Sequence, residues 1–127
     1  QRSTVVIDDD QSSRDLLSRI LAAAGHEVDA CADGREAYEK LRREPFTLLL
    51  TDIVMPGMTG IELAREIFRL HPELPVVLTS GYSHVLSEHG SEGFELLQKP
   101  YSIEQLSLVL HRVAQLKPRQ EPSPASS

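Results

Sequence analysis

Five short apolar runs alternate with segments of helical periodicity along most of the chain, and this alternation restricts the fold more than any other feature. The runs span residues 4–8, 27–31, 46–51, 75–79 and 94–98. Strands that alternate with helix-length segments are typical of βαβ units, in which crossover helices join parallel strands. The sequence therefore predicts an α/β fold with a doubly wound, five-stranded parallel sheet.

Residues that start and end helices support this division. Gly25, Pro45 and Pro72 each follow an amphipathic segment and are expected to end its helix. The expected N-terminal caps are Ser12 or Ser13, then Asp33, then Thr59 with Glu62, and finally Ser102 with Gln105. The helical signal is weakest in residues 81–93, where Val85 and Leu86 are the only adjacent apolar pair.

A chain of 127 residues fits a single domain whose core needs no disulfide or metal. We expect this domain to span residues 1–116. Residues 117–127 are rich in proline and serine, contain no large apolar side chain and are expected to form a disordered tail. Because the first residue is Gln1 rather than methionine, we expect the chain to be a segment of a longer or processed protein.

The composition disfavours several functions. A formal net charge of −6 and a pI near 5.3 argue against nucleic-acid binding by this segment. No apolar stretch approaches the roughly 20 residues that cross a bilayer, so no membrane contact is expected. The single cysteine, Cys31, is expected to be buried and reduced, which fits a cytoplasmic location. The five histidines are dispersed without metal-ligand spacing and are mostly expected at the surface, none as a catalytic base.

Acidic residues close two of the apolar runs. Asp52 follows the run at 46–51, and Asp8-Asp9-Asp10 follows Val5-Val6-Ile7. Because open α/β sheets bind ligands at the carboxyl ends of their strands, these carboxylates are expected to converge on one site. Two like charges about 4 Å apart repel by roughly 4 kcal/mol at an effective dielectric of ~20, which favours a bound cation. Ligands that are all oxygen indicate Mg²⁺ or Mn²⁺ rather than zinc.

Polar residues also follow the fourth and fifth runs, where Ser80 and Lys99-Pro100 stand. Taken singly, an acid at a strand end has an ordinary structural role in turns and helix starts, and a lone lysine or serine is usually solvated surface. Together they meet the needs of phosphoryl transfer, namely an oxygen nucleophile, a divalent metal, a cation and a hydroxyl donor. We therefore predict that these strand ends form one phosphoryl-transfer site.

Four motifs occur in a fixed order along the chain. They are Ile7-Asp8-Asp9-Asp10, Asp52-Ile53-Val54-Met55-Pro56-Gly57-Met58-Thr59-Gly60, Thr79-Ser80-Gly81 and Lys99-Pro100-Tyr101. This ordered set resembles the receiver domain of two-component response regulators, over about residues 4–116. The resemblance implies a flavodoxin-like (βα)5 fold with strand order 2-1-3-4-5. It also implies a phosphorelay signalling module, not an enzyme, that receives its phosphoryl group from the phosphohistidine of a histidine kinase or phosphotransfer domain.

The resemblance implies a role for each residue of the site. The implied residues are Asp52 as the phosphorylation site; Asp8, Asp9, Asp52 and the Val54 carbonyl as Mg²⁺ ligands; Ser80, Gly81 and Lys99 as phosphoryl-binding groups; and Leu96, Pro100 and Tyr101 as conformational residues. Asp9 would bind the metal directly and Asp8 largely through water. The Lys99–Pro100 peptide bond is expected to be cis, and Asp10 to begin a helix.

Several positions depart from the family pattern or refine it. Leu96 stands where the family often carries an aromatic switch residue. The resemblance implies that Val54 and Tyr82 border the path of the attacking water. Val54 cannot hydrogen-bond to that water and the bulky Tyr82 ring is expected to shield the phosphoryl group, so we expect slow hydrolysis of the phosphorylated form; the alternative is that both side chains merely pack. The strings at residues 79–83 and 98–102 resemble receivers of hybrid sensor histidine kinases, so the parent chain is expected to be such a kinase.

Two other functions would use the same residues. One is a metal-dependent phosphohydrolase acting on a separate substrate in the same acidic crevice. The other is an interaction domain with an inactive site. A hydrolase needs a substrate-recognition insertion and a general acid, whereas the connections here are short, and an inactive domain would not need the full set of chemical groups. The sequence gives no signal for an oligomeric state.

Overall fold

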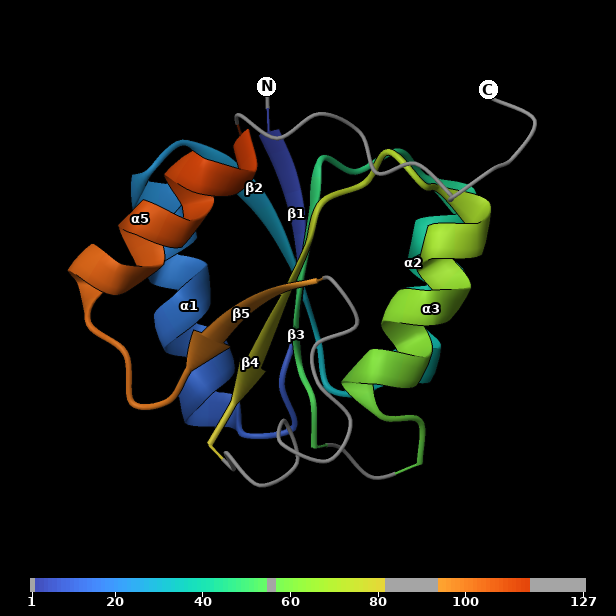
Figure 1. Ribbon diagram of the computed structural model, residues 1–127, viewed down its shortest axis with the longest axis horizontal. Coiled ribbons are helices and arrows are strands. Elements are labelled where there is room, and N and C mark those ends of the chain that lie inside the picture. Colours follow the sequence, from blue (N-terminus) through green and yellow to red (C-terminus); the bar gives the residue numbers. More distant parts are fainter. Residues whose placement is uncertain (1, 55–56, 82–93, 115–127) are drawn as a thin grey trace, which may run out of the picture.

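The computed structural model describes residues 2–54, 57–81 and 94–114. Its centre is one parallel sheet of five strands in the order β2-β1-β3-β4-β5 (Figure 1). The strands are β1 (Arg2–Ile7), β2 (His26–Cys31), β3 (Leu48–Asp52), β4 (Val76–Ser80) and β5 (Glu95–Gln98). The described helices are α1 (Gln11–Ala23), α2 (Gly34–Arg43), α3 (Gly60–Leu70) and α5 (Ile103–Ala114). The predicted α/β fold and strand order are confirmed.

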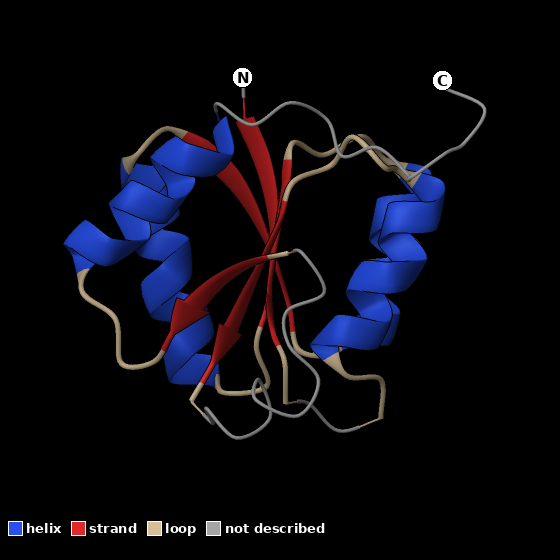
Figure 2. Cartoon of the chain, in the orientation of Figure 1, coloured by secondary structure: helices blue, strands red, loops and turns tan. Residues whose placement is uncertain are grey.

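Helices cover both faces of the sheet, with α1 and α5 on one side and α2 and α3 on the other (Figures 1 and 2). Alternate strand residues face opposite layers. Val5 and Leu49 pack in the cluster that contains residues of α2 and α3, whereas Val6 and Leu50 pack in the cluster of α1 and α5. Strands β3 and β4 are therefore buried along their whole length. Burying one leucine of this kind stabilises the fold by about 1.5–3 kcal/mol.

Two groups of predictions lie outside the described residues: the helix expected in residues 81–93 beyond Gly81, and the tail at 117–127. Elsewhere the strand bounds differ from expectation by one or two residues. The third strand begins at Leu48 rather than residue 46, and it runs through Asp52, so the acid is the last strand residue.

The cap of the first helix was expected at Ser12 or Ser13, and this is wrong. Helix α1 begins at Gln11, and its N-cap is Asp10, whose carboxylate accepts a hydrogen bond from the Ser13 backbone N–H. An aspartate caps a helix as well as a serine does, and starting earlier gains a further bond from the Ser13 hydroxyl. The expectation that Asp10 begins a helix is confirmed.

The other caps follow the sequence patterns. Asp33 caps α2, and Thr59 with Glu62 forms a reciprocal capping box at α3. Ser102 and Gln105 exchange the same two bonds before α5, with donor–acceptor distances of 2.8 and 3.0 Å. Gly25 follows α1 with φ +94°, a conformation that side chains with a Cβ rarely adopt.

Cys31 is buried as a free thiol, as expected, and burial raises its pKa to about 11. His26 departs from the surface placement expected of most histidines, because it is buried with Nδ1 2.8 Å from the Thr4 hydroxyl. His84 and His89 lie outside the described residues. No helix in the described ranges is long and apolar enough to cross a membrane.

Candidate functional site

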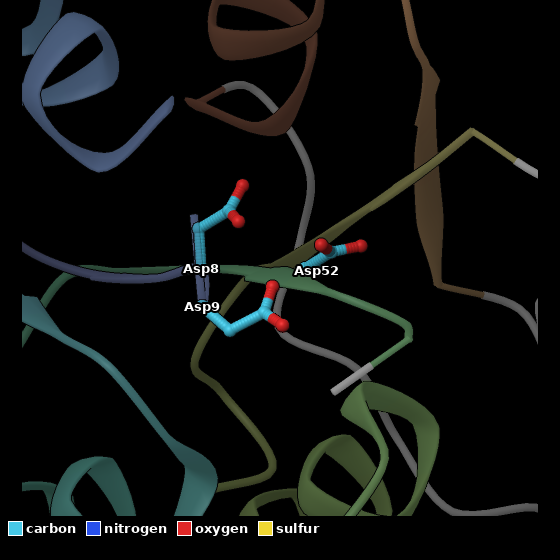
Figure 3. Close-up of side chains that lie close together, drawn as sticks. All are labelled: Asp8, Asp9 and Asp52. Atoms are coloured by element: carbon cyan, nitrogen blue, oxygen red, sulfur yellow. The ribbon is translucent and has the colours of Figure 1, made fainter. Parts of the chain in front are cut away.

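Three carboxylates meet at the carboxyl edge of the sheet. Asp8 and Asp9 follow β1, and Asp52 ends the neighbouring strand β3. One oxygen from each of the three carboxylates lies within 4.8 Å of the others, and Figure 3 shows the side chains gathered at the strand ends. Asp8 is fully buried and Asp52 is 7% exposed, whereas Asp9 is open to solvent. The predicted convergence of the acidic strand ends is confirmed.

Lys99 reaches these carboxylates from the far side of β4. Its Nζ donates to Asp8 Oδ2 at 3.0 Å and to Asp52 Oδ2 at 3.3 Å. The Lys99–Pro100 peptide bond is cis, as expected. Burial alone would lower the pKa of Lys99, but its hydrogen bonds and the charges of the two carboxylates outweigh that effect and raise the pKa. Lys99 therefore stays charged at neutral pH.

The surroundings of Asp52 disfavour its ionised carboxylate. Burial raises the pKa of Asp52, and the negative charge of Asp8 raises it further. Lys99 and the backbone N–H of Val54 act in the opposite direction but do not cancel the rise. Since the ionised form is disfavoured even with Lys99 present, a cation beside these carboxylates would stabilise it.

The donor set fits a hard divalent cation. Carboxylate oxygens are the ligands that Mg²⁺ prefers, and the described part of the cluster contains no sulfur or imidazole donor. Asp8, Asp9 and Asp52 are the residues that would hold the ion. Val54 follows Asp52 by two residues and is 44% exposed.

The remaining predicted residues take different positions. Ser80 ends β4, is fully buried and accepts the Lys99 backbone N–H through its carbonyl at 2.8 Å. A Cβ placed on Gly81 would lie 4.0 Å from the Cβ of Lys99, so Gly81 also borders this lysine. Leu96 is not at the acidic edge but packs beside the core cluster of α2 and α3. Tyr82 lies outside the described residues.

Pro100 and Tyr101 continue the chain beyond Lys99. Pro100 is exposed, whereas Tyr101 is half-buried and packs beside the core cluster of α1 and α5. Burial raises the pKa of Tyr101 to about 12, and the charges of Lys99, Asp8 and Asp52 also act on it. The Tyr101 ring therefore lies near the acidic edge in neutral form.

Comparison with known proteins identifies the family. A family model described as the response regulator receiver domain matches residues 4–111. The chain belongs to the response regulator receiver family. Receivers are signalling modules that accept phosphoryl groups from histidine kinases or phosphotransfer proteins, and the acidic edge with Lys99 is where such chemistry would occur here.

Individual relatives agree with this assignment. The chain is 39% identical over 105 residues to the response regulator receiver protein CpdR of Brucella abortus, covering 80% of this chain and 88% of CpdR. It is 36% identical over 127 residues to the DNA-binding transcriptional regulator NtrC of Escherichia coli, covering 96% of this chain and only 27% of NtrC. The structure of TrrA from Thermotoga maritima, solved in complex with Mg²⁺-BeF, superposes with a TM-score of 0.83 at 30% identity, covering 89% of this receiver and 99% of TrrA.

Three residues near the receiver site make contacts that the sequence analysis did not anticipate, although Thr79 and Gly60 stand within the quoted motifs. Arg14 donates from Nη1 to the Asp8 carbonyl at 2.7 Å. Thr79, in register with Asp52, is buried and its hydroxyl finds no hydrogen-bond partner within the described residues. Gly60 approaches the Asp52 main chain so closely that it excludes any side chain. Arg14 and Gly60 each contact a strand end from the helix that follows it, and Thr79 lies on a neighbouring strand, and hydrophobic periodicity predicts none of these side-chain contacts.

Proposed function

We propose that this receiver accepts a phosphoryl group on Asp52 from a phosphohistidine, with Mg²⁺ held by Asp8, Asp9, Asp52 and the Val54 carbonyl. The observation that carries the proposal is the buried Asp52 carboxylate, 3.3 Å from Lys99 Nζ and within 4.8 Å of two further carboxylates. A nucleophile, a cation and a metal-ligand set therefore share one edge of the sheet. Mn²⁺ has the same preference for oxygen ligands and would serve as a substitute.

Each residue of the site has a distinct role in the proposed phosphoryl transfer. A carboxylate oxygen of Asp52 forms the new P–O bond while the P–N bond to the donor imidazole breaks, and the imidazole leaves with a proton. When bound, Mg²⁺ would neutralise charge on the phosphoryl oxygens. The Lys99 ammonium then exchanges its Asp52 contact for a phosphoryl oxygen. Ser80 and the Gly81 backbone, at the end of the neighbouring strand, are proposed to donate to the remaining phosphoryl oxygens.

Loss of the Lys99–Asp52 ion pair is the change that the rest of the receiver would sense. Phosphorylation removes a carboxylate charge from Asp52 and places a larger anion at its tip. We propose that Leu96, Pro100 and Tyr101, which precede and follow Lys99, adjust to the new position of this lysine. Leu96 faces the α2 and α3 core and Tyr101 the α1 and α5 core, so both faces would respond.

A long-lived phosphorylated state belongs to the proposal. The Val54 side chain is 44% exposed beside the site and cannot orient a water by hydrogen bonding. Tyr82 is proposed to act with Val54 as a bulky neighbour. A missing water-orienting contact costs a few kcal/mol of transition-state stabilisation, which slows hydrolysis by about 10²-fold. Measuring the half-life of phosphorylated Val54→Asn and of Val54→Asn with Tyr82→Glu tests this, and half-lives equal to wild type would exclude a lifetime role.

The proposal extends to the location, parent protein and partners of the receiver. We infer a cytoplasmic module of a hybrid histidine kinase, supported by the buried free thiol of Cys31 and by the short sequence strings around Ser80 and Pro100. Its partners are a histidine kinase or a phosphotransfer domain. The net charge of −6 supports the absence of nucleic-acid contacts by this segment, although NtrC, a relative of which this chain covers 27%, is named as a DNA-binding regulator.

Stoichiometry tests the proposed function. Incubation with Mg²⁺ and acetyl phosphate or phosphoramidate should label the receiver with at most one phosphoryl group per chain. Release of phosphate should not exceed the slow decay of that labelled form. Rapid release of many phosphates per chain, without labelled protein, would instead establish a phosphohydrolase.

A further inference from the structure

We propose that Arg14 is a positioning residue for the metal site, because its guanidinium fixes the peptide between Asp8 and Asp9 and so aims the Asp9 carboxylate at the cation. This inference rests on the proposed function. Arg14 lies in α1, five residues after Asp9, and its Nη1 donates to the Asp8 carbonyl oxygen at 2.7 Å. That carbonyl belongs to the peptide that joins the two proposed ligands.

The Asp8 carbonyl lies just beyond the end of the sheet ladder. Register between β1 and its neighbours ends at Ile7, opposite Cys31 on one side and Thr51 on the other. Asp8 contributes one more main-chain bond through its N–H, which donates to the Cys31 carbonyl at a long 3.3 Å. The Arg14 bond is shorter and charge-assisted, so it is the stronger restraint on this peptide.

The residues around Asp9 are held, whereas its own carboxylate is not. The Asp8 carboxylate accepts from the Asp10 N–H at 2.9 Å and from Lys99 Nζ at 3.0 Å. The Asp10 carboxylate is engaged as the cap of α1 by Ser13. Within the described residues the structure records no hydrogen bond or ion pair to the exposed Asp9 carboxylate. Its direction therefore depends on the main chain on either side, and Arg14 controls the side nearer to Asp8.

The Arg14 guanidinium has two opposing effects on a nearby cation. By charge alone, the Arg14 guanidinium repels a divalent cation and weakens its binding. By geometry, the same group holds a ligand-bearing peptide in place and strengthens binding, as hydrogen-bond partners of metal ligands commonly do. The two effects have opposite signs, so a variant that removes both reveals which one dominates. The short bond to Asp8 indicates that the geometric effect dominates.

Mg²⁺ titration of the receiver by calorimetry tests the proposal, with the Mg²⁺-dependent rise in Tm as a second readout. Arg14→Met removes the charge and the bond, and the account predicts an affinity about tenfold weaker than wild type. Arg14→Lys can still donate to the Asp8 carbonyl and should recover most of that loss. Arg19→Met, an exposed change on the same helix, removes the same charge elsewhere and should leave the affinity within about twofold, because a surface charge is screened.

The outcomes separate this inference from the function on which it rests. If wild type binds no Mg²⁺, the proposed function fails. If wild type binds Mg²⁺ and Arg14→Met binds it equally well or more tightly, the positioning role is overturned while the proposed function stands. Urea unfolding of each variant confirms that affinities are compared between folded proteins.

Discussion

Gly60 packs directly against the main chain of Asp52. A Cβ on Gly60 would lie 2.9 Å from the Asp52 carbonyl carbon, closer still to its oxygen, and 3.0 Å from the Ile53 Cα. The Gly60 N–H also donates to the Ile53 carbonyl at 2.9 Å. The first turn of α3 is therefore braced on the backbone that carries the proposed phosphoacceptor, and no side chain fits between them.

Substituting Gly60 should displace Asp52 as well as destabilise the fold. We expect Gly60→Ala to weaken beryllofluoride binding in Mg²⁺ by at least about tenfold, since a small misplacement of a reacting group costs far more than that in related chemistry. Gly57→Ala is the matched control, because Gly57 has φ +80° and open space around it. That variant suffers backbone strain of about 1–2 kcal/mol without touching Asp52. Equal affinities in the two alanine variants would show that Gly60 affects stability alone.

The charge on Asp52 should destabilise the metal-free protein. Its folded-state pKa is raised, chiefly by burial, so the folded protein binds a proton more tightly than the unfolded chain. Stability is therefore lost as pH rises from the ordinary value of 3.8 through the folded-state pKa. In chelator, Asp52→Asn should raise the Tm at pH 7, and this gain should shrink as the pH is lowered toward 4. A gain that is constant across this range would contradict the electrostatic explanation.

The unpaired hydroxyl of Thr79 predicts an unusual stabilising substitution. Thr79 is buried with no partner for Oγ1 among the described residues, so Thr79→Val should leave stability unchanged or raise it by up to about 1 kcal/mol. The control is Thr51→Val one strand away, where the lost hydroxyl lies 3.0 Å from the Asp52 carbonyl. That variant should lose about 1 kcal/mol. Urea unfolding measures both, and a clear loss of stability in Thr79→Val would refute the prediction.

Sequence patterns predicted the parts of the fold that depend on local order. Periodicity predicted the alternation of strands and helices, local capping chemistry predicted the caps at Asp33, Thr59 and Ser102, and the family resemblance implied the strand order. The acidic edge was also predictable, because strand ends in a parallel sheet must meet. Local patterns were ambiguous at the start of α1, where Asp10 rather than Ser12 or Ser13 caps the helix and accepts two hydrogen bonds from Ser13.

Contacts between neighbouring elements were not predictable, whether the residues are six positions apart, as for Arg14 and Asp8, or 22, as for Thr4 and His26. The Arg14 side chain donates to the Asp8 carbonyl at the end of β1, the buried His26 ring lies against the Thr4 hydroxyl, and Gly60 packs against the Asp52 main chain. Arg14 and His26 look ordinary in their own sequence windows, and Gly60 is part of a quoted motif that does not reveal which atoms it contacts. Their roles arise from the three-dimensional approach of backbones and side chains, which a single sequence does not specify.

Metal binding should depend unequally on the acidic residues. Asp9→Ala should abolish the calorimetric signal of Mg²⁺, because its exposed carboxylate is free to bind the ion directly. Asp8→Ala should weaken binding less, since the Asp8 carboxylate already pairs with Lys99. Asp15→Ala removes one acidic charge from α1 outside the cluster and should bind Mg²⁺ like wild type. Unchanged affinity in both Asp8 and Asp9 variants would exclude the acidic edge as the metal site.

The most direct test of the account is to locate the phosphoryl group itself. Wild type and Asp52→Asn are incubated with acetyl phosphate and Mg²⁺, and intact-protein mass spectrometry measures the fraction that gains one phosphoryl group. Asp15→Asn serves as the control for loss of a carboxylate elsewhere. The account predicts labelling of wild type and of Asp15→Asn, and none of Asp52→Asn. Labelling of Asp52→Asn to the same extent as wild type would contradict the assignment of Asp52 as the phosphoacceptor.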